Sequence, residues 1–296
     1  MKKEIFTVLL LLAVMTVVQA QKPLTIEPGS EKFGNTDCPG IWIDIPETNL
    51  ETIRSNWVKA IEKGTKSNAL KTGDEVTLFG ALIGDIYDGP INVFSKLIGQ
   101  DSLVKLFVSV EITRDVFTAP NSKENENMKA FARSFAKDQY QKVAEDQLSK
   151  EENKLKDLEK QLVSLRKDKE RYEKEIQNAN TTISEENYKI GSVKKEMAVT
   201  ESTLDSKSTE LSRMDDGDQK KATQSEVKEL QKRKKSNMKD ISTSENKISK
   251  ANTEITDNNN NIAANLKHQD EVSAQIADQK VVVRNYTEKL KNIKSY

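Results

Sequence analysis

Two side chains that could act as catalytic groups each occur once in this sequence. Cys38 is the only cysteine and His268 the only histidine, and they lie far apart in the chain. A catalytic thiol needs a neighbouring base, and serine-histidine-aspartate catalysis needs a positioned histidine. The local sequence meets neither requirement, so we expect no enzymatic activity and an inert or intermolecularly paired Cys38. A single cysteine also excludes an intrachain disulfide.

One short acidic stretch is the nearest approach to a metal-binding pattern. It consists of six consecutive residues, Asp215, Asp216, Gly217, Asp218, Gln219 and Lys220. A calcium loop of the EF-hand type needs oxygen ligands at alternate positions and a closing glutamate, which this stretch lacks. Aspartate and glycine favour turns. We therefore expect a turn here and no metal site, and no glycine-rich phosphate loop indicates a cofactor elsewhere.

The same six residues are the candidate site for binding a partner. The acidic turn is followed by a basic stretch that extends to Lys235. Opposite charges side by side on an exposed turn would suit a protein partner or an anionic surface. The alternative is a solvated turn that binds nothing.

A heptad repeat on both sides of the turn predicts the elements that position it. In a coiled coil, apolar residues at the first and fourth positions of each heptad face the partner helix. Before the turn, the first positions are Leu155, Leu162, Lys169, Ile176, Ile183, Ile190, Met197, Leu204 and Leu211. After the turn, they are Val227, Lys234, Ile241, Ile248, Ile255, Ile262, Gln269, Ile276, Val283 and Leu290. The fourth positions after the turn are mostly polar or small, which predicts a narrow seam.

Two arms of nearly equal length favour an antiparallel hairpin, and each arm should extend roughly 100 Å. The alternative is parallel pairing of two chains through the first arm. Weak helix formers interrupt both arms, at Asn178–Thr182 and at Asp257–Asn261. These stretches predict either a bend or polar seam residues that fix the register of the two arms.

Composition narrows the class of protein. Lys and Arg number 47, Asp and Glu also number 47, and the formal net charge is zero, which argues against nucleic-acid binding. Lys2 and Lys3, the apolar stretch Phe6–Val18 and the small residue Ala20 are typical of a secretory signal peptide cleaved before Gln21. We therefore expect a periplasmic or secreted protein with no transmembrane span in the mature chain.

The residues before the first arm predict a small folded head. Alternating apolar residues indicate strands at Ile41–Ile45, Glu75–Ile83, Ile91–Ile98 and Leu103–Ile112, the last two joined by a tight turn. Thr48 and Glu51 suggest a capping box for a helix that ends at Gly64. A second helix begins near Asn121 or Ser122 and continues as the first arm. The face of the last strand that carries Phe107 and Glu111 should be the wetter one.

The predicted fold is α+β, a small antiparallel-sheet head domain followed by a long antiparallel α-helical coiled-coil hairpin. Its parts are a signal peptide at 1–20, a linker at 21–40, the head at 41–145, arm one at 146–214, the turn at 215–223 and arm two at 224–296. The helix Trp57–Lys63 and the segments Glu151–Lys160 and Val281–Tyr286 complete a pattern that resembles a group of exported coiled-coil proteins of Bacteroidota. That resemblance implies no activity and no functional residues.

Three functions remain open from the sequence. The first is a non-enzymatic adaptor or spacer of the cell envelope that binds a protein partner, with a homo-oligomer also allowed. The second is a periplasmic holdase chaperone or hydrolase regulator, which requires exposed apolar residues on the arms. The third is a ligand-binding head with a coiled-coil oligomerisation stalk, in which Trp42, Trp57, Phe79 and Phe94 would line a pocket or simply pack in a core.

Overall fold

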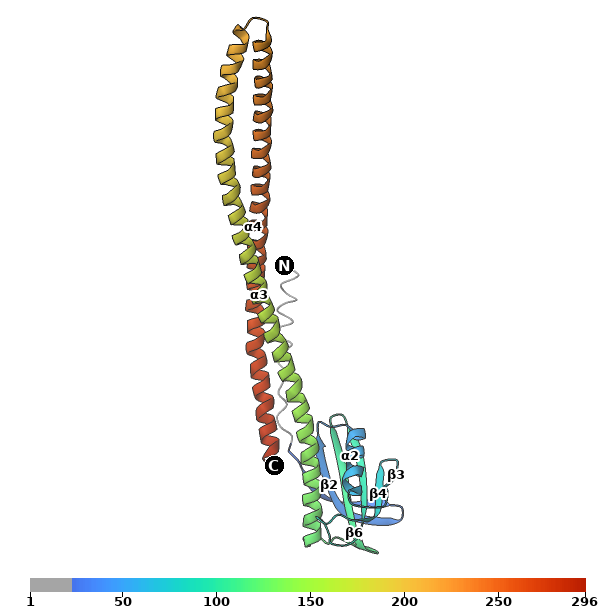
Figure 1. Ribbon diagram of the computed structural model, residues 1–296. Helices are drawn as coiled ribbons and strands as arrows, with labels where there is room; N and C mark the ends of the chain where they lie inside the picture. The colour runs from blue at the N-terminus through green and yellow to red at the C-terminus, as the bar shows by residue number, and fades with distance from the viewer. Residues whose placement is uncertain (1–22) are drawn as a thin grey trace. The chain divides into compact units, whose positions relative to one another are not determined.

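The computed structural model describes residues 23–296 (Figure 1). The chain divides into two compact units. The head unit contains residues 23–155 and the C-terminal segment Asp278–Tyr296, and the hairpin unit is Lys156–Ala277. The expected signal peptide, 1–20, lies outside the described residues. None of the described helices has an apolar run long enough to cross a membrane.

The head unit is built on an antiparallel sheet of seven strands. The strands are β1 Ile26–Phe33, β2 Thr36–Pro46, β3 Leu70–Thr72, β4 Glu75–Ala81, β5 Ile91–Gln100, β6 Leu103–Thr113 and β7 Val116–Phe117. Their order in the sheet is β1-β2-β6-β5-β4-β3, and β7 pairs with the end of β6. The predicted tight turn between the third and fourth expected strands is confirmed, because Gln100 of β5 pairs with Leu103 of β6.

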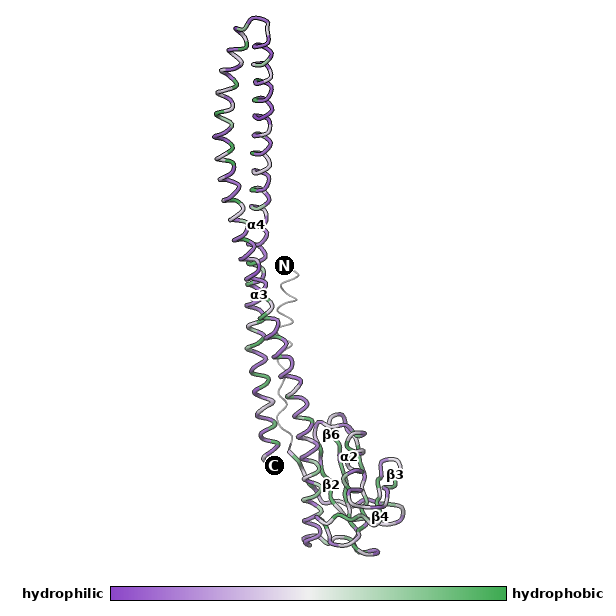
Figure 2. The backbone as a smooth tube through the Cα atoms, in the orientation of Figure 1, coloured by the Kyte–Doolittle hydropathy of each residue, from purple (hydrophilic) through white to green (hydrophobic). Residues whose placement is uncertain are grey.

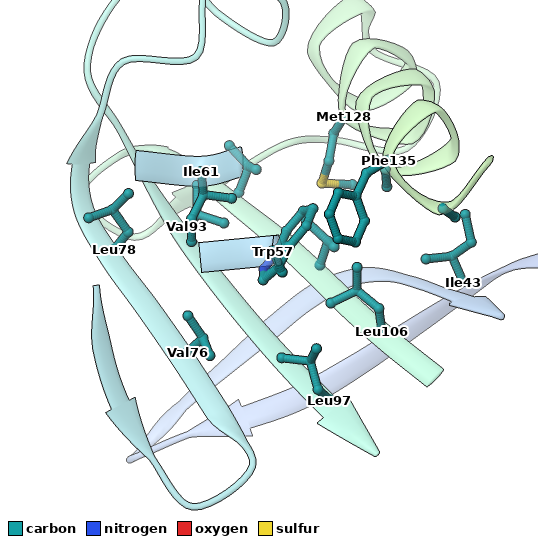
Figure 3. Close-up of a cluster of buried hydrophobic side chains, with 14 of the residues drawn as sticks. Ile43, Trp57, Ile61, Val76, Leu78, Val93, Leu97, Leu106, Met128 and Phe135 are labelled. Carbon is teal, nitrogen blue, oxygen red and sulfur yellow. The ribbon is translucent and has the colours of Figure 1, made fainter. Parts of the chain in front are cut away.

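Helix α2, Leu50–Glu62, and the first turns of helix α3, Lys123–Arg213, cover one face of the sheet. Alternate residues of β2, β4, β5 and β6 point into this core, as the period of two in a strand requires. Figure 3 shows Trp57 of α2 at its centre, beside Phe135 and Met128 of α3. The Trp57 ring lies 4.9 Å from the Phe135 ring, and its indole N–H donates to Ser95 Oγ at 2.9 Å. The expected pair of helices on one side of an antiparallel sheet is therefore confirmed.

The start of α2 differs from the predicted capping box. Asn49 is the N-cap, and its side-chain oxygen accepts a hydrogen bond from the backbone N–H of Thr52 at 2.9 Å. The Thr48 hydroxyl instead donates to the carbonyl of Ile45. Asparagine is as good an N-cap as serine or threonine, so the neighbouring residue took the position. Gly64 follows the helix with a positive φ of 83°, as expected for a helix end.

The expected linker at 21–40 is wrong from Ile26 onward, because β1 and the first half of β2 occupy that range. Proline and glycine there suggested a loop, but they permit a bend within the strands. β2 pairs with β6 only from Ile41 to Pro46. A Cβ atom on Gly40 would collide with the carbonyl oxygen of Val108 and lie 2.7 Å from the Phe107 ring. Glycine at this position therefore allows the end of the β1–β2 hairpin to approach β6 closely.

That bent hairpin covers part of the second face of the sheet. The Phe33 ring lies 5.4 Å from the Phe94 ring of β5, and Glu31 of β1 pairs with Lys96 of β5 at 3.0 Å. β1 and β5 are not neighbours in the sheet, so β1 must lie over its face. Phe107 is consequently fully buried. Glu111 on the same face is only 9% exposed, and its carboxylate accepts from the Asn92 amide and the backbone N–H of Asp115. The prediction that this is the wetter face is wrong for these residues.

The hairpin unit consists of the rest of α3 and the matching part of helix α4, Asp218–Lys294. Cross-arm ion pairs set the antiparallel register, with Lys207 3.0 Å from Glu226, Arg233 2.6 Å from Glu196 and Lys247 2.5 Å from Glu186. The residues buried between the arms are Ala179, Thr200, Thr223, Val227, Asn237, Ser244, Ala251, Asn258, Asn265, Val272 and Ile276. Figure 2 shows that most of the surrounding helix is hydrophilic. The predicted narrow, partly polar seam is confirmed.

The two asparagine-rich stretches lie inside unbroken helices. Ala179 and Asn258 from these stretches are buried in the seam. Thr181 and Thr182 donate to the carbonyl oxygens of residues four positions earlier, at 3.1 Å each. Nearby, the Asn265 amide donates to the carbonyl oxygen of Leu165 across the seam at 3.0 Å. The burial of Asn258 and the hydrogen bond of Asn265 across the seam favour polar residues that fix the register.

Candidate functional site

The turn at the end of the hairpin unit is shorter than expected. α3 ends at Arg213 and α4 begins at Asp218, so only Met214–Gly217 lies outside the helices. The Gly217 carbonyl already accepts from the N–H of Lys221, which makes Gly217 the residue before the first helical turn. The expected turn at 215–223 is therefore too long at its C-terminal end. The second arm, expected from 224, begins at Asp218. An aspartate in the first turn of a helix is favourable, because it lies near the positive end of the helix dipole.

The six candidate residues lie together on this tip, which we define as Asp215–Lys220. Asp216 Oδ1 accepts from Lys220 Nζ at 2.8 Å, and Asp218 lies 3.7 Å from Lys221 Nζ. The hydrogen bond from Lys220, together with its charge, lowers the pKa of Asp216. Asp215 makes no ion pair with any residue that the structure describes. The tip therefore presents an exposed, net acidic turn.

Two residues of the basic stretch after the tip, Arg233 and Lys234, pair with the opposite arm. Arg233 forms a forked contact with Glu196, at 2.6 and 2.8 Å, and Lys234 lies 2.8 Å from Glu201. The contact with Glu201 raises the pKa of Lys234. Lys232 pairs with Glu229 on its own helix at 2.7 Å. Arg233 and Lys234 therefore help to hold the two arms together, and the acidic tip lies beside them at the end of the unit.

The two candidate catalytic side chains have surroundings that do not activate them. Cys38 is completely buried, and burial, followed by the nearby charges of Glu111 and Asp37, raises the pKa of its thiol to about 11. A thiol with so high a pKa is protonated at neutral pH and a poor nucleophile. His268 belongs to the other unit, is 66% exposed and lies 3.3 Å from Glu271 on the same helix.

The four aromatic residues considered for a pocket do not come together. Trp57 fills the helix-covered core, whereas Trp42 and Phe94 belong to the cluster on the opposite face with Phe107. Phe79 is half exposed and packs edge-on to Phe94 at 6.0 Å. Core packing on two separate faces, rather than a shared pocket, explains these residues.

The head unit contains a buried ion pair that the sequence did not predict. Glu47 Oε2 lies 2.5 Å from Lys289 Nζ, and Gln147 donates to the same carboxylate oxygen at 3.0 Å. Lys289 also lies 5.7 Å from the ring centres of Tyr140 and Tyr286. We call Glu47, Tyr140, Gln147 and Lys289 the clasp, because it joins the loop before α2 to both long helices. Nothing in the local sequence around Glu47 indicates a partner near the C-terminus.

No protein-family model matches this chain, and no curated protein sequence matches it. Within residues 23–296, no group of three or more His, Cys, Asp or Glu side chains is arranged to hold a metal ion. The tip and the head unit are therefore interpreted from their own chemistry.

Proposed function

We propose that this chain is an exported, non-enzymatic interaction protein of the cell envelope. The hairpin unit acts as a spacer, and the tip, Asp215–Lys220, binds a protein partner. The observation that carries this proposal is the contrast between the arms and the tip. Four basic side chains of the arms pair with a glutamate of the opposite arm, namely Lys207, Arg233, Lys234 and Lys247, whereas the tip retains an exposed acidic turn in which Asp215 makes no ion pair with a described residue.

The construction of the arms supports the role of a spacer. Ion pairs recur along the seam, from Glu186 with Lys247 to Lys207 with Glu226, and the seam asparagine Asn265 fixes the register. Each arm of the unit spans roughly 90 Å at 1.5 Å rise per residue. Most of the stability of a helix in a protein comes from packing against a neighbour. Two helices that pack against each other along this length therefore position the turn more rigidly than a single exposed helix would.

The environments of Cys38 and His268 support a role without catalysis. The cysteine is buried with a raised pKa, and the histidine is solvated beside a glutamate of its own helix. Neither side chain has the geometry that activates a nucleophile. Asp216 and Asp218 of the tip pair with lysines four and three positions later in the chain, which is the ordinary arrangement of a solvated helix start.

The chaperone alternative needs a continuous apolar surface along the arms. The exposed large apolar residues of the hairpin unit are Val163, Tyr188, Val199, Met238 and Leu266. On the first arm, Val163, Tyr188 and Val199 fall at three different heptad positions. On the second arm, Met238 and Leu266 share a heptad position but lie four heptads apart, so they form no continuous apolar surface. Residues at different positions point in different directions around a helix. Scattered single residues of this kind are normal on protein surfaces and do not favour client binding.

The proposed export of the chain can be tested separately from the binding of a partner. We expect the chain recovered from the cell envelope to begin at Gln21 after removal of the signal peptide. Intact-mass measurement of the recovered protein would give the mass of residues 21–296. Recovery of the full-length mass from the cytoplasm would contradict export.

The proposed function is tested by photo-crosslinking in the native envelope. A photoreactive residue replaces Gln219 in one protein and Tyr188, which is 83% exposed on an arm of the same unit, in a control. We expect a discrete crosslinked band from the Gln219 protein and a weaker band or none from the Tyr188 protein. A band from Tyr188 alone would move the binding surface to the arms, and the absence of both bands would contradict a partner at the tip.

A further inference from the structure

The head unit contains a cavity that neither the heptads nor the aromatic residues predict. It has a volume of about 530 Å³ and lies between the first turns of α3 and the β1–β2 hairpin. The strand side is formed by Ile26, Pro28 and Ile41, and the helix side by Asn125, Lys129 and Arg133. The helix residues follow one another at intervals of four, so they share a face of α3. Cavities of this size accommodate small molecules or peptide ends.

The position of the Asn125 side chain in the cavity wall indicates a ligand. It is 8% exposed and lines the cavity. Its backbone N–H donates to the Ser122 side chain at 3.1 Å, but its side-chain amide makes no hydrogen bond to any residue among 23–296. The amide atoms of Asn125 are not among the enclosed polar atoms that lack a partner, so they reach the solvent that fills the cavity. A solvent-facing amide on a largely buried residue is held in place and free to bind a polar group that enters the cavity.

The charges around the cavity determine whether the bound group is expected to be negative or positive. Lys129 Nζ pairs with Glu126 Oε1 at 2.8 Å, so these two charges largely cancel. The guanidinium of Arg133 makes no ion pair with a described residue and leaves the wall with a net positive charge. The cavity also borders the start of α3, where Ser122 caps the helix and the helix dipole is positive. Arginine binds carboxylates through two parallel hydrogen bonds.

We propose that this cavity binds a terminal carboxylate, with Arg133 contacting the carboxylate and Asn125 contacting the polar group next to it. The source of the carboxylate is either a short peptide with a free C-terminus or a small organic acid. Both have the same group at the end of a short chain. The site is independent of the tip, because it lies wholly within the head unit.

The test uses the full chain and three probes, followed by ligand-observed NMR titration. The probes are acetyl-Ala-Ala with a free carboxylate, the same dipeptide as its C-terminal amide, and succinate. We expect the free-acid dipeptide or succinate to bind and the amide to bind at least about tenfold more weakly, because it lacks the charge that Arg133 contacts. Binding of the free-acid dipeptide without succinate would assign a peptide end, and binding of succinate would assign a small acid.

Two variants separate binding from folding. Arg133→Gln removes the guanidinium and should weaken binding roughly tenfold. Asn125→Asp keeps the size of the side chain and places a negative charge in the first turn of α3, which favours the helix but repels a carboxylate. Arg114→Gln is the matched control, because Arg114 has a 96% exposed side chain and does not line the cavity.

We expect Asn125→Asp to retain the thermal midpoint of the wild type while losing the ligand, and Arg114→Gln to behave as the wild type in both respects. Equal binding of the acid and the amide, binding unaffected by both cavity variants, or no binding of any probe at millimolar concentration would each overturn the proposal.

Discussion

Glu47 and Lys289 form a buried ion pair, with Glu47 Oε2 2.5 Å from Lys289 Nζ, although 242 positions separate the two residues in the chain. Both side chains are at most 9% exposed. Glu47 adopts a left-handed backbone conformation, with φ of 58°, which is unfavourable for a residue other than glycine. Its backbone N–H donates to the Ser102 carbonyl at 2.7 Å, so the loop is held in this conformation from both ends. The C-terminal helix thereby becomes part of the fold of the head unit.

Removing one member of the clasp should destabilise the head unit. In Lys289→Met, the Glu47 carboxylate would remain buried without its counter-charge, and we expect a loss of about 3 kcal/mol in the free energy of unfolding. Urea denaturation followed by tryptophan fluorescence measures this unit, because Trp42 and Trp57 both belong to it. Lys291→Ala, an exposed position on the same helix, is the control and should change the free energy little. The double variant Glu47→Gln with Lys289→Met should recover part of the loss, and a Lys289→Met protein as stable as the control would contradict the clasp.

The clasp also predicts how stability depends on pH. Burial opposes ionisation of Glu47, but hydrogen bonds from Lys289, Gln147 and Tyr140 and the charge of Lys289 together lower the pKa of its carboxyl below the ordinary value of 4.5. A lowered pKa in the folded state gives stability that is present above the unfolded pKa and is lost as the pH falls through the folded pKa. We expect the urea midpoint of the wild type to fall below about pH 4.5 more steeply than that of Glu47→Gln. Parallel pH profiles for the two proteins would show that Glu47 has no lowered pKa.

Gly40 should control access to Cys38. A Cβ atom at this position would meet the Val108 carbonyl and the Phe107 ring, so Gly40→Ala should open the β1–β2 hairpin away from β6. The wild-type thiol, which is buried and protonated, should react slowly with a thiol reagent, and the variant should react at least about tenfold faster because reactivity follows exposure and thiolate content. Gly84→Ala is the control, because nothing lies within 4 Å of its Cβ and its φ is ordinary. Equally slow reaction in both variants would show that the hairpin tolerates the extra atom.

The seam residue Asn265 should specify register at a cost in stability. Its side chain donates to the Leu165 carbonyl and accepts from Gln269. Replacing it by leucine buries more apolar surface and should stabilise the hairpin unit by on the order of 1 kcal/mol. The loss of the cross-arm hydrogen bond should also permit other pairings, which size-exclusion chromatography with light scattering would detect as oligomers. Thermal unfolding followed by helical circular dichroism gives the stability, and a less stable variant with an unchanged oligomeric state would refute this role.

The helical hairpin could be predicted from the sequence because its signal is local and repeats every seven residues. Leu155 through Leu211 identify one helix by spacing alone, and Asp215 to Gly217 identify where it turns. The strands of the sheet could also be predicted from the sequence wherever apolar residues alternate, as in β6. These elements depend on interactions between residues close together in the chain.

The parts that could not be predicted depend on contacts between distant residues. Pro28, Gly29, Pro39 and Gly40 have the composition of a linker, yet they form bent strands because the bend brings Phe33 onto β5 and β6. Lys289 is one of many lysines in the second arm, and nothing near it in the sequence indicates a buried glutamate as its partner. The cavity lined by Asn125 and Arg133 likewise depends on packing α3 against β1 and β2, which no local pattern encodes.

Binding of a protein partner by the tip, Asp215–Lys220, is tested most directly by a competition experiment. Envelopes containing the Gln219 photoreactive protein are incubated with excess purified full-length chain before irradiation. One competitor is the wild type, one carries Asp215→Asn, Asp216→Asn and Asp218→Asn, and a matched control carries Asp157→Asn, Asp168→Asn and Asp205→Asn on the arm. We predict that the wild type and the arm variant suppress the crosslinked band and that the tip variant does not. Equal suppression by the tip variant, or no suppression by any competitor, would contradict binding through the tip.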